Sequence, residues 1–191
     1  MARRSSSCGM LGVTSTGGST TDTFEQQMLP HLGAAFTLAR YLLREVADAE
    51  DAVQEAYLQA LRHFRGFRGE NPRAWLLTIV RRACYAWTDR EGRVGGSTDP
   101  DLLDDLPAEG DDPETEVVRG ELQEQLSRAV DALPLPFREV IVLREIQELS
   151  YQEIATVIGA PVGTVMSRLA RARRRLQRAL AAQGMGGTYG L

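Results

Sequence analysis

The chain has 191 residues, a formal net charge of −4 and a hydrophobic fraction of 43%. This length allows one domain or two small ones, and the apolar fraction is sufficient for a buried core. No apolar run reaches the roughly 18 residues that a membrane-spanning helix needs, no apolar segment of a signal peptide follows Arg3 and Arg4, and Cys8 and Cys84 belong to no Cys/His cluster. Composition therefore argues against membrane insertion, a disulfide framework and a zinc site, and it predicts a cytoplasmic protein.

Charge is distributed unevenly along the chain. The segment from Asp99 to Glu116 holds nine acidic residues and no arginine, whereas Val162 to Gln183 holds six arginines and no acid. Such a split between segments indicates that they have separate tasks.

The first half is predicted to contain a small helical domain at 23–91. Residues 1–22 are rich in Ser, Thr and Gly without periodicity, which predicts a disordered tail. The spacing of apolar residues predicts helices over 23–44, 48–64 and roughly 72–90. We expect Pro30 to interrupt the first helix, Asp48 to cap the second and Pro72 to open the third, after a glycine-rich loop.

The second half is predicted to form another helical domain at 117–183. Residues 92–116 have the composition of a flexible acidic linker, and 184–191 are expected to be a disordered tail. Apolar spacing predicts helices over 115–133 and 137–149, with Val140, Leu143, Ile146 and Gln147 on the inner face of the second. Strand patterns are lacking, so the predicted class is all-α, with two domains whose separation varies in solution.

Residues 150–182 carry the pattern of a helix-turn-helix. Ser150 and Glu153 form an S-x-x-E capping box that starts one helix, and Gly159 is suited to end it. Pro161 then opens the next helix, so that a three-residue turn joins the two.

The second of these helices is predicted to have two distinct faces. Val162, Val165, Leu169, Ala172, Leu176 and Leu180 recur at helical spacing, and the opposite side carries polar and cationic residues, namely Thr164, Ser167, Arg168, Arg171, Arg174, Arg175 and Arg178. A helix of this kind fits the DNA major groove, where arginine binds phosphates and guanine edges. The alternative interpretation is an exposed arginine-rich helix that simply ends a small bundle.

Taken together, these segments resemble an extracytoplasmic-function (ECF) sigma factor of bacterial RNA polymerase. The resemblance covers residues 24–182 and rests on four blocks in the family's order: "DAEDAVQEAYLQAL", "FRGENPRAWLLTIVRR", "LPLPFREVIVLREIQELSYQEIA" and "PVGTVMSRLARARRRL". It implies a specificity subunit, without catalytic residues, metal or cofactor, that directs promoter recognition, DNA melting and transcription initiation.

The resemblance also implies roles for residues of the first domain. Asp51, Gln54 and Glu55 match the contacts to the beta-prime clamp helices of core polymerase. The loop from Phe67 to Pro72 matches the segment that captures a flipped base of the melted promoter, for which a pocket and a stacking surface are needed. The residues assigned to the melted strand are Phe67, Arg68, Asn71, Arg73, Arg81 and Arg82. Arg82 stands where the family often has Asn.

In the second domain the resemblance places the upstream promoter element on the second helix of the helix-turn-helix. Met166, Ser167, Ala170 and Arg171 match positions that face the bases, and Thr164, Arg168, Arg174 and Arg175 complete the assigned surface. The implied partners are core RNA polymerase, through its beta-prime clamp helices and beta flap, together with promoter DNA and an anti-sigma factor.

Two other classes of function fit the sequence less well. A two-domain regulator that binds an operator without polymerase would share the helix-turn-helix but would need a sensing first domain. An enzyme has no support, because His31 and His63 are isolated and no phosphate-binding loop, HExxH motif or Ser-His-Asp set is present in the sequence.

Overall fold

The computed structural model describes residues 20–68, 71–90 and 118–182, and within these ranges it is helical without any strand. The all-α prediction is therefore confirmed. The acidic linker, the C-terminal tail and nearly all of the N-terminal tail lie outside the described residues, so the domain boundaries stay predictions.

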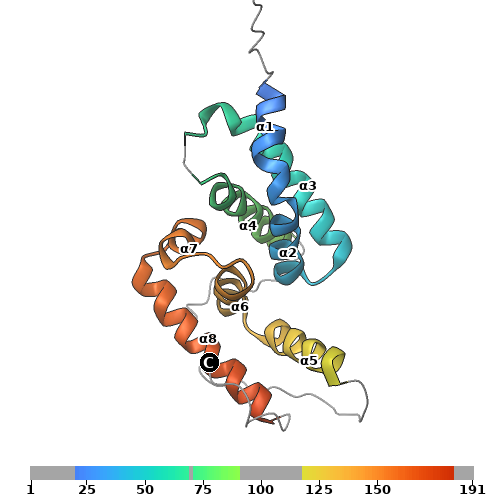
Figure 1. The fold of residues 1–191 in the computed structure, drawn as a ribbon, viewed down its shortest axis with the longest axis vertical. Helices are drawn as coiled ribbons and strands as arrows, with labels where there is room; N and C mark the ends of the chain where they lie inside the picture. Colours follow the sequence, from blue (N-terminus) through green and yellow to red (C-terminus); the bar gives the residue numbers. More distant parts are fainter. Residues whose placement is uncertain (1–19, 69–70, 91–117, 183–191) are drawn as a thin grey trace, which may run out of the picture.

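The first domain contains helices α1 (Thr20–Met28), α2 (Leu32–Leu43), α3 (Val46–His63) and α4 (Pro72–Arg90) (Figure 1). Pro30 interrupts the first predicted helix as expected, because a 3₁₀ turn at Leu29–His31 separates α1 from α2. The predicted cap of α3 is wrong: the helix begins at Val46 after Glu45, which places Asp48 inside the first turn. An acidic residue there still suits the helix dipole.

Small residues bring α3 close to its neighbours. Its buried face is made of alanines and one valine, namely Ala49, Ala52, Val53, Ala56 and Ala60, and it packs against α2 and α4. Leu61 lies outside this alanine-rich face and is 39% exposed.

The second domain contains α5 (Val118–Ala132), α6 (Leu135–Ile141), α7 (Tyr151–Ile158) and α8 (Val162–Ala182). Pro134 is the N-cap of α6 and Pro136 lies in its first turn, where proline is tolerated since those amides have no intrahelical acceptor. The two prolines therefore start a helix that begins two residues earlier than predicted.

The helix predicted over 137–149 ends three residues early, at Ile146, in a π-helical turn. After α6 the chain continues through a wide turn at Val142–Ile146, in which the amide of Gln147 donates to the carbonyl of Val142 at 2.9 Å. Such a turn takes up more residues than an α-turn and therefore rotates the side chains after it about the helix axis. As a result Gln147 is buried, at 3% exposure, as predicted, whereas Ile146 is 41% exposed and does not face inward.

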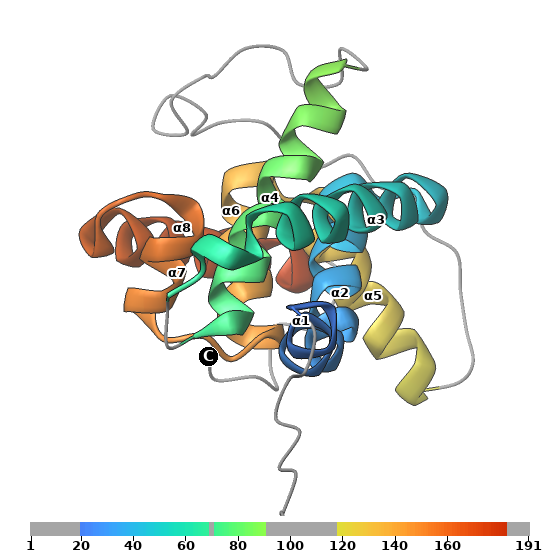
Figure 2. The same cartoon turned by 90° about the horizontal axis from the view of Figure 1, so that it is seen from above.

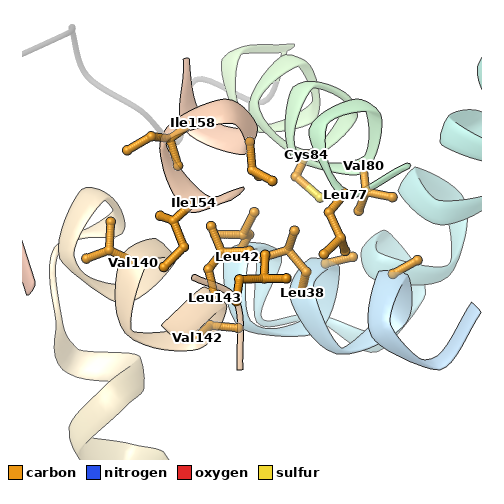
Figure 3. Close-up of a cluster of buried hydrophobic side chains, with 14 of the residues drawn as sticks. Leu38, Leu42, Leu77, Val80, Cys84, Val140, Val142, Leu143, Ile154 and Ile158 are labelled. Atoms are coloured by element: carbon orange, nitrogen blue, oxygen red, sulfur yellow. The ribbon is translucent and has the colours of Figure 1, made fainter. Parts of the chain in front are cut away.

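The two predicted domains pack against each other in a closed arrangement. α4 contacts α7 and α2 contacts α6, and the views from the side and from above agree on this (Figures 1 and 2). Side chains of both domains meet in a single apolar cluster (Figure 3): Leu38, Leu42, Leu77, Val80 and Cys84 from the first, with Val140, Val142, Leu143, Ile154 and Ile158 from the second. The structure thus differs from the expected variable separation, because α4 carries a wider apolar face than α2 and α3 cover.

Candidate nucleic-acid interface

The helix-turn-helix is formed as its sequence predicts. The hydroxyl of Ser150 accepts from the amide of Glu153 at 3.2 Å, and the Glu153 carboxylate accepts from the Ser150 amide at 2.8 Å. The Ser150 hydroxyl also donates to this carboxylate at 2.7 Å, and this bond, together with the one from the Ser150 amide, lowers the pKa of Glu153. α7 then ends at Gly159, whose φ of 67° and ψ of 35° lie in the left-handed region.

Two glycines of this motif are expected to respond oppositely to alanine. Gly159→Ala should lower the melting temperature, since the left-handed conformation costs an L-residue about 1–2 kcal/mol and no atom lies within 4 Å to compensate. Gly163→Ala should raise it, because Gly163 is helical, its surroundings are equally open, and alanine gains about 0.5–1 kcal/mol there. Thermal unfolding followed by circular dichroism measures both, and shifts of the same sign would contradict the turn geometry.

The outward face of α8 contains most of the residues assigned to the upstream element. Met166 is 54% exposed, and Ser167, Ala170 and Arg174 are exposed as well. Thr164 and Arg171 are half-exposed at the edge of this face. Ser167 donates to the carbonyl of Thr164 at 3.0 Å, and Arg174 donates to that of Ala170 at 3.3 Å. The face therefore mixes apolar surface with hydrogen-bonding groups, as contacts with base edges require.

Three other arginines of α8 lie against their own domain, whereas Arg178 is exposed. Arg175 lies over the ring of Phe137, with its guanidinium carbon 5.1 Å from the ring centre. Arg173 pairs with Glu145 at 2.6 Å on the opposite flank. Arg168 is half-buried, and its Nε has no hydrogen-bond partner among the described residues. Arg168 and Arg175 are thus placed at the edge of the helix rather than at the centre of the outward face.

In the first domain, Phe67 belongs to an aromatic cluster. Its ring stacks on Phe64 at 6.1 Å and tilts against Trp75 at 4.8 Å, while Phe64 meets Phe24 edge-on at 5.2 Å. Phe67 and Trp75 are only half-buried, so that one side of the cluster is accessible. Such a surface suits the stacking of an unpaired base.

The polar residues assigned to the melted strand divide into two groups. Arg68 and Arg82 are exposed. Asn71, Arg73 and Arg81 instead bond to the second domain: Asn71 donates to Glu153 at 2.5 Å, Arg73 donates to Gln147 at 2.6 Å, and Arg81 donates to Glu139. Asn71 also caps α4, because its side-chain oxygen accepts from the amide of Ala74 at 2.9 Å.

The residues assigned to polymerase binding lie on the outer side of α3. Asp51 and Gln54 are exposed, whereas Glu55 is half-buried, accepts from Gln59 at 3.2 Å and pairs with Arg90 at 3.6 Å. Leu58 shares the exposed face with Asp51 and Gln54 and is itself 56% exposed. The sequence pattern did not single out Leu58, although its position outside the apolar stripe of α3 was a usable signal.

Two arginines cap helices across the domain boundary. Arg138 donates to the carbonyl of Tyr41 near the C-terminus of α2 at 2.9 Å, and Arg44 donates to that of Asp131 near the C-terminus of α5 at 2.5 Å. Cations stabilise helix C-termini because the last carbonyls there have no intrahelical partner. Burial and the neighbouring charge of Arg44 lower the pKa of Arg138 to about 10. Sequence alone offered no signal for this pairing.

The described parts of the chain give no sign of a metal site or of a membrane-spanning helix. No group of three or more His, Cys, Asp or Glu side chains is arranged there to hold a metal ion. Nor does any helix in these ranges combine the length and apolarity that crossing a bilayer demands.

Comparisons with known proteins match both halves separately. Residues 28–94 match the family Sigma-70 region 2, and residues 123–176 match Sigma-70, region 4. Among solved structures, the sigma factor RpoE in complex with the anti-sigma factor NepR from Bartonella quintana aligns with a TM-score of 0.64 and 30% identity, over 83% of this chain and 97% of that one. The structure of CnrH in complex with the cytosolic domain of CnrY aligns at 0.60 and 27% identity, over 87% and 92%.

Curated relatives of this chain are also sigma factors, and they match it over most of its length. The ECF RNA polymerase sigma factor SigE of Mycolicibacterium smegmatis is 32% identical over 83% of this chain, which spans 62% of that protein's length. The ECF RNA polymerase sigma-E factor of Escherichia coli K12 is 35% identical over 68% of this chain and 72% of its own length. The resemblance stated from the sequence is thereby confirmed, and the chain belongs to the ECF family of RNA polymerase sigma factors.

Proposed function

We propose that this chain binds core RNA polymerase and directs it to promoters, with α8 reading an upstream duplex element and the first domain holding the melted strand. Family membership supports the role of a specificity subunit without catalysis of its own, acting in the cytoplasm where polymerase works. The acidic linker, proposed to follow the RNA path of polymerase, lies outside the described residues.

The observation that carries the proposal is the outward face of α8. The preceding turn, fixed by Gly159, holds α8 against α6 and α7 so that Met166, Ser167 and Ala170 project away from the domain. The major groove of B-DNA is wide enough to admit one such helix. Ser167 and Arg171 supply hydrogen bonds, while Met166 and Ala170 supply only apolar contacts, so sequence readout there is sparse and leaves room for DNA shape.

An anti-sigma factor is the proposed regulator. Both solved structures named above contain a sigma factor together with a second chain, described for RpoE as an anti-sigma factor. Their likeness to this chain supports a protein partner of this kind.

One experiment distinguishes the proposed function from the alternative, an operator-binding regulator that acts without polymerase. Purified chain is mixed with core polymerase and a promoter template, and run-off transcripts are measured with each component omitted in turn. Transcription that depends on both components supports the proposal. Specific binding of the free chain to duplex DNA, without any transcript, would support the regulator instead.

The exposed face of α3 is expected to bind core polymerase. Asp51→Arg combined with Gln54→Ala should weaken association with core polymerase at least about tenfold. The double variant reverses one interfacial charge and removes one hydrogen-bonding side chain, and a loss of about 1.4 kcal/mol is enough for a tenfold change in affinity. Both side chains are exposed, so the fold should be unaffected. Co-purification with core polymerase and titration of labelled chain measure the loss.

Glu25→Arg is the control for the α3 variant. It reverses one charge at an exposed position of the same domain, on α1 rather than on the face of α3 under test. Equal losses for the control and the double variant would show a general charge effect and would remove the assignment of this face. We leave Glu55 unchanged because its carboxylate already pairs with Arg90.

A further inference from the structure

The second domain contains buried polar side chains whose partners lie on the first domain. Arg138, Glu139 and Gln147 are 4%, 0% and 3% exposed. Arg138 bonds to the carbonyl of Tyr41 and Gln147 donates to that of Ala34 at 3.4 Å, while Arg73 and Arg81 donate to Gln147 and Glu139. A buried charge without a partner is strongly unfavourable. These side chains are therefore suited to the closed arrangement, and the contact between the domains is a specific one.

Glu139 is the centre of this contact. Its carboxylate accepts from Arg81 Nε and, at 3.3 Å, from the hydroxyl of Tyr85, and the guanidinium of Arg81 lies 4.4 Å above the ring of Tyr85. Complete burial raises the pKa of Glu139, and the charges of Arg81 and Arg168 oppose that rise. The carboxylate of Glu139 thus binds an arginine of the surface assigned to the melted strand.

We propose that Glu139 acts as an internal substitute for a DNA phosphate, which holds Arg81 and masks the strand-binding face of the first domain until the two domains separate. Carboxylate and phosphate oxygens both accept charge-assisted hydrogen bonds from guanidinium groups, so that one replaces the other on the same arginine. This inference rests on the proposed role of Arg81 in holding the melted strand, and it adds an autoinhibitory contact to that role.

The masking extends beyond Arg81. Asn71 and Arg73 are bonded to Glu153 and Gln147 of the second domain, so neither is available to a nucleic acid in the closed arrangement. Of the polar residues assigned to the strand, Arg68 and Arg82 alone remain exposed. Only molecules whose two domains have separated can bind a single strand through these residues, and the apparent affinity is reduced in proportion to their fraction. The free chain should therefore bind single strands weakly.

The test uses the full-length chain without polymerase. Binding of a fluorescein-labelled single-stranded oligonucleotide is followed by anisotropy, and opening is followed independently by small-angle X-ray scattering. Glu139→Gln leaves Arg81 without its ionic partner, so we expect a larger radius of gyration and an affinity for the oligonucleotide at least about tenfold higher than that of the wild type. Glu124→Gln is the matched control, because it removes the same charge from an exposed ion pair with Arg128 inside α5.

Tyr85→Phe provides a second variant that preserves the fold. It removes only the hydroxyl that donates to Glu139, so the expected changes have the same direction and a smaller size. Unchanged oligonucleotide affinity in a variant that scattering shows to be open would overturn the masking. An unchanged radius of gyration in both variants would overturn the role of Glu139 in holding the domains together.

Failure of the underlying DNA assignment gives a different result. In an Arg81→Ala background, the gain in affinity caused by Glu139→Gln should be smaller than in the wild-type background, because Asn71 and Arg73 are still released but Arg81 no longer contributes. A gain of equal size in the two backgrounds would refute the role of Arg81 while leaving the domain contact intact.

Discussion

Phe137→Ala should destabilise the protein by about 3–5 kcal/mol, the usual cost of removing a buried phenylalanine. Phe137 is 1% exposed and is among the largest fully buried side chains in the described residues. It belongs to α6, which packs against α8, and its ring also supports Arg175. A loss of this size is a large part of the 5–15 kcal/mol or so by which a domain is stable, so much of the variant should be unfolded at 37 °C. Urea unfolding followed by circular dichroism measures the difference.

Leu126→Ala is the control for the Phe137 variant. Leu126 is 46% exposed on α5 of the same domain, so its truncation removes little buried surface and should change stability by under about 0.5 kcal/mol. Similar losses in the two variants would contradict the central position of Phe137. Because one apolar cluster joins both domains, we also expect a single unfolding transition rather than two.

Arg171→Ala should relax sequence preference at one position of the upstream element, at a cost of about 1–3 kcal/mol for the preferred base pair. Arg171 lies one helical turn after Ser167, at the edge of the outward face of α8. From there its guanidinium can bond to a base edge. The measurement is the affinity of holoenzyme for duplexes that carry matched or scrambled upstream elements.

Arg174→Ala is the comparison for Arg171→Ala. Arg174 is exposed and donates locally to the carbonyl of Ala170, so that removing it should weaken all duplexes about equally and lower the salt slope by about one unit. Arg175 is less suitable for this comparison because its guanidinium lies on Phe137. If Arg171→Ala and Arg174→Ala behaved alike on both sequences, Arg171 would contact only phosphate.

The local structure of this chain could be predicted from its sequence wherever a short motif determines it. The capping box at Ser150, the left-handed Gly159 and the interruption at Pro30 each depend on neighbours within a few residues. The π-helical turn at Val142–Ile146 could not be predicted, because apolar spacing alone does not reveal a change in the number of residues per turn. Ile146 was therefore placed on the wrong face.

The candidate sites were predicted less completely, for a different physical reason. The outward face of α8 follows from periodicity within one helix, so the exposure of Met166 and Ser167 could be anticipated. Arg81 and Glu139 lie 58 positions apart in the sequence, and no local pattern connects them. The available signal was the pair Arg138 and Glu139 within the apolar run 137–143, since a charge that such a run buries requires a partner.

The crossed caps formed by Arg44 and Arg138 have an evolutionary consequence. Each guanidinium completes a helix end that belongs to the other half of the chain. A hybrid gene that joined either half to the corresponding half of a distant paralogue would leave one of these helix ends without its cap, unless the donor half carried the matching arginine. We therefore expect the two halves to be inherited together. Substitution of either arginine is disfavoured because it would leave a helix end in the other half without its cap.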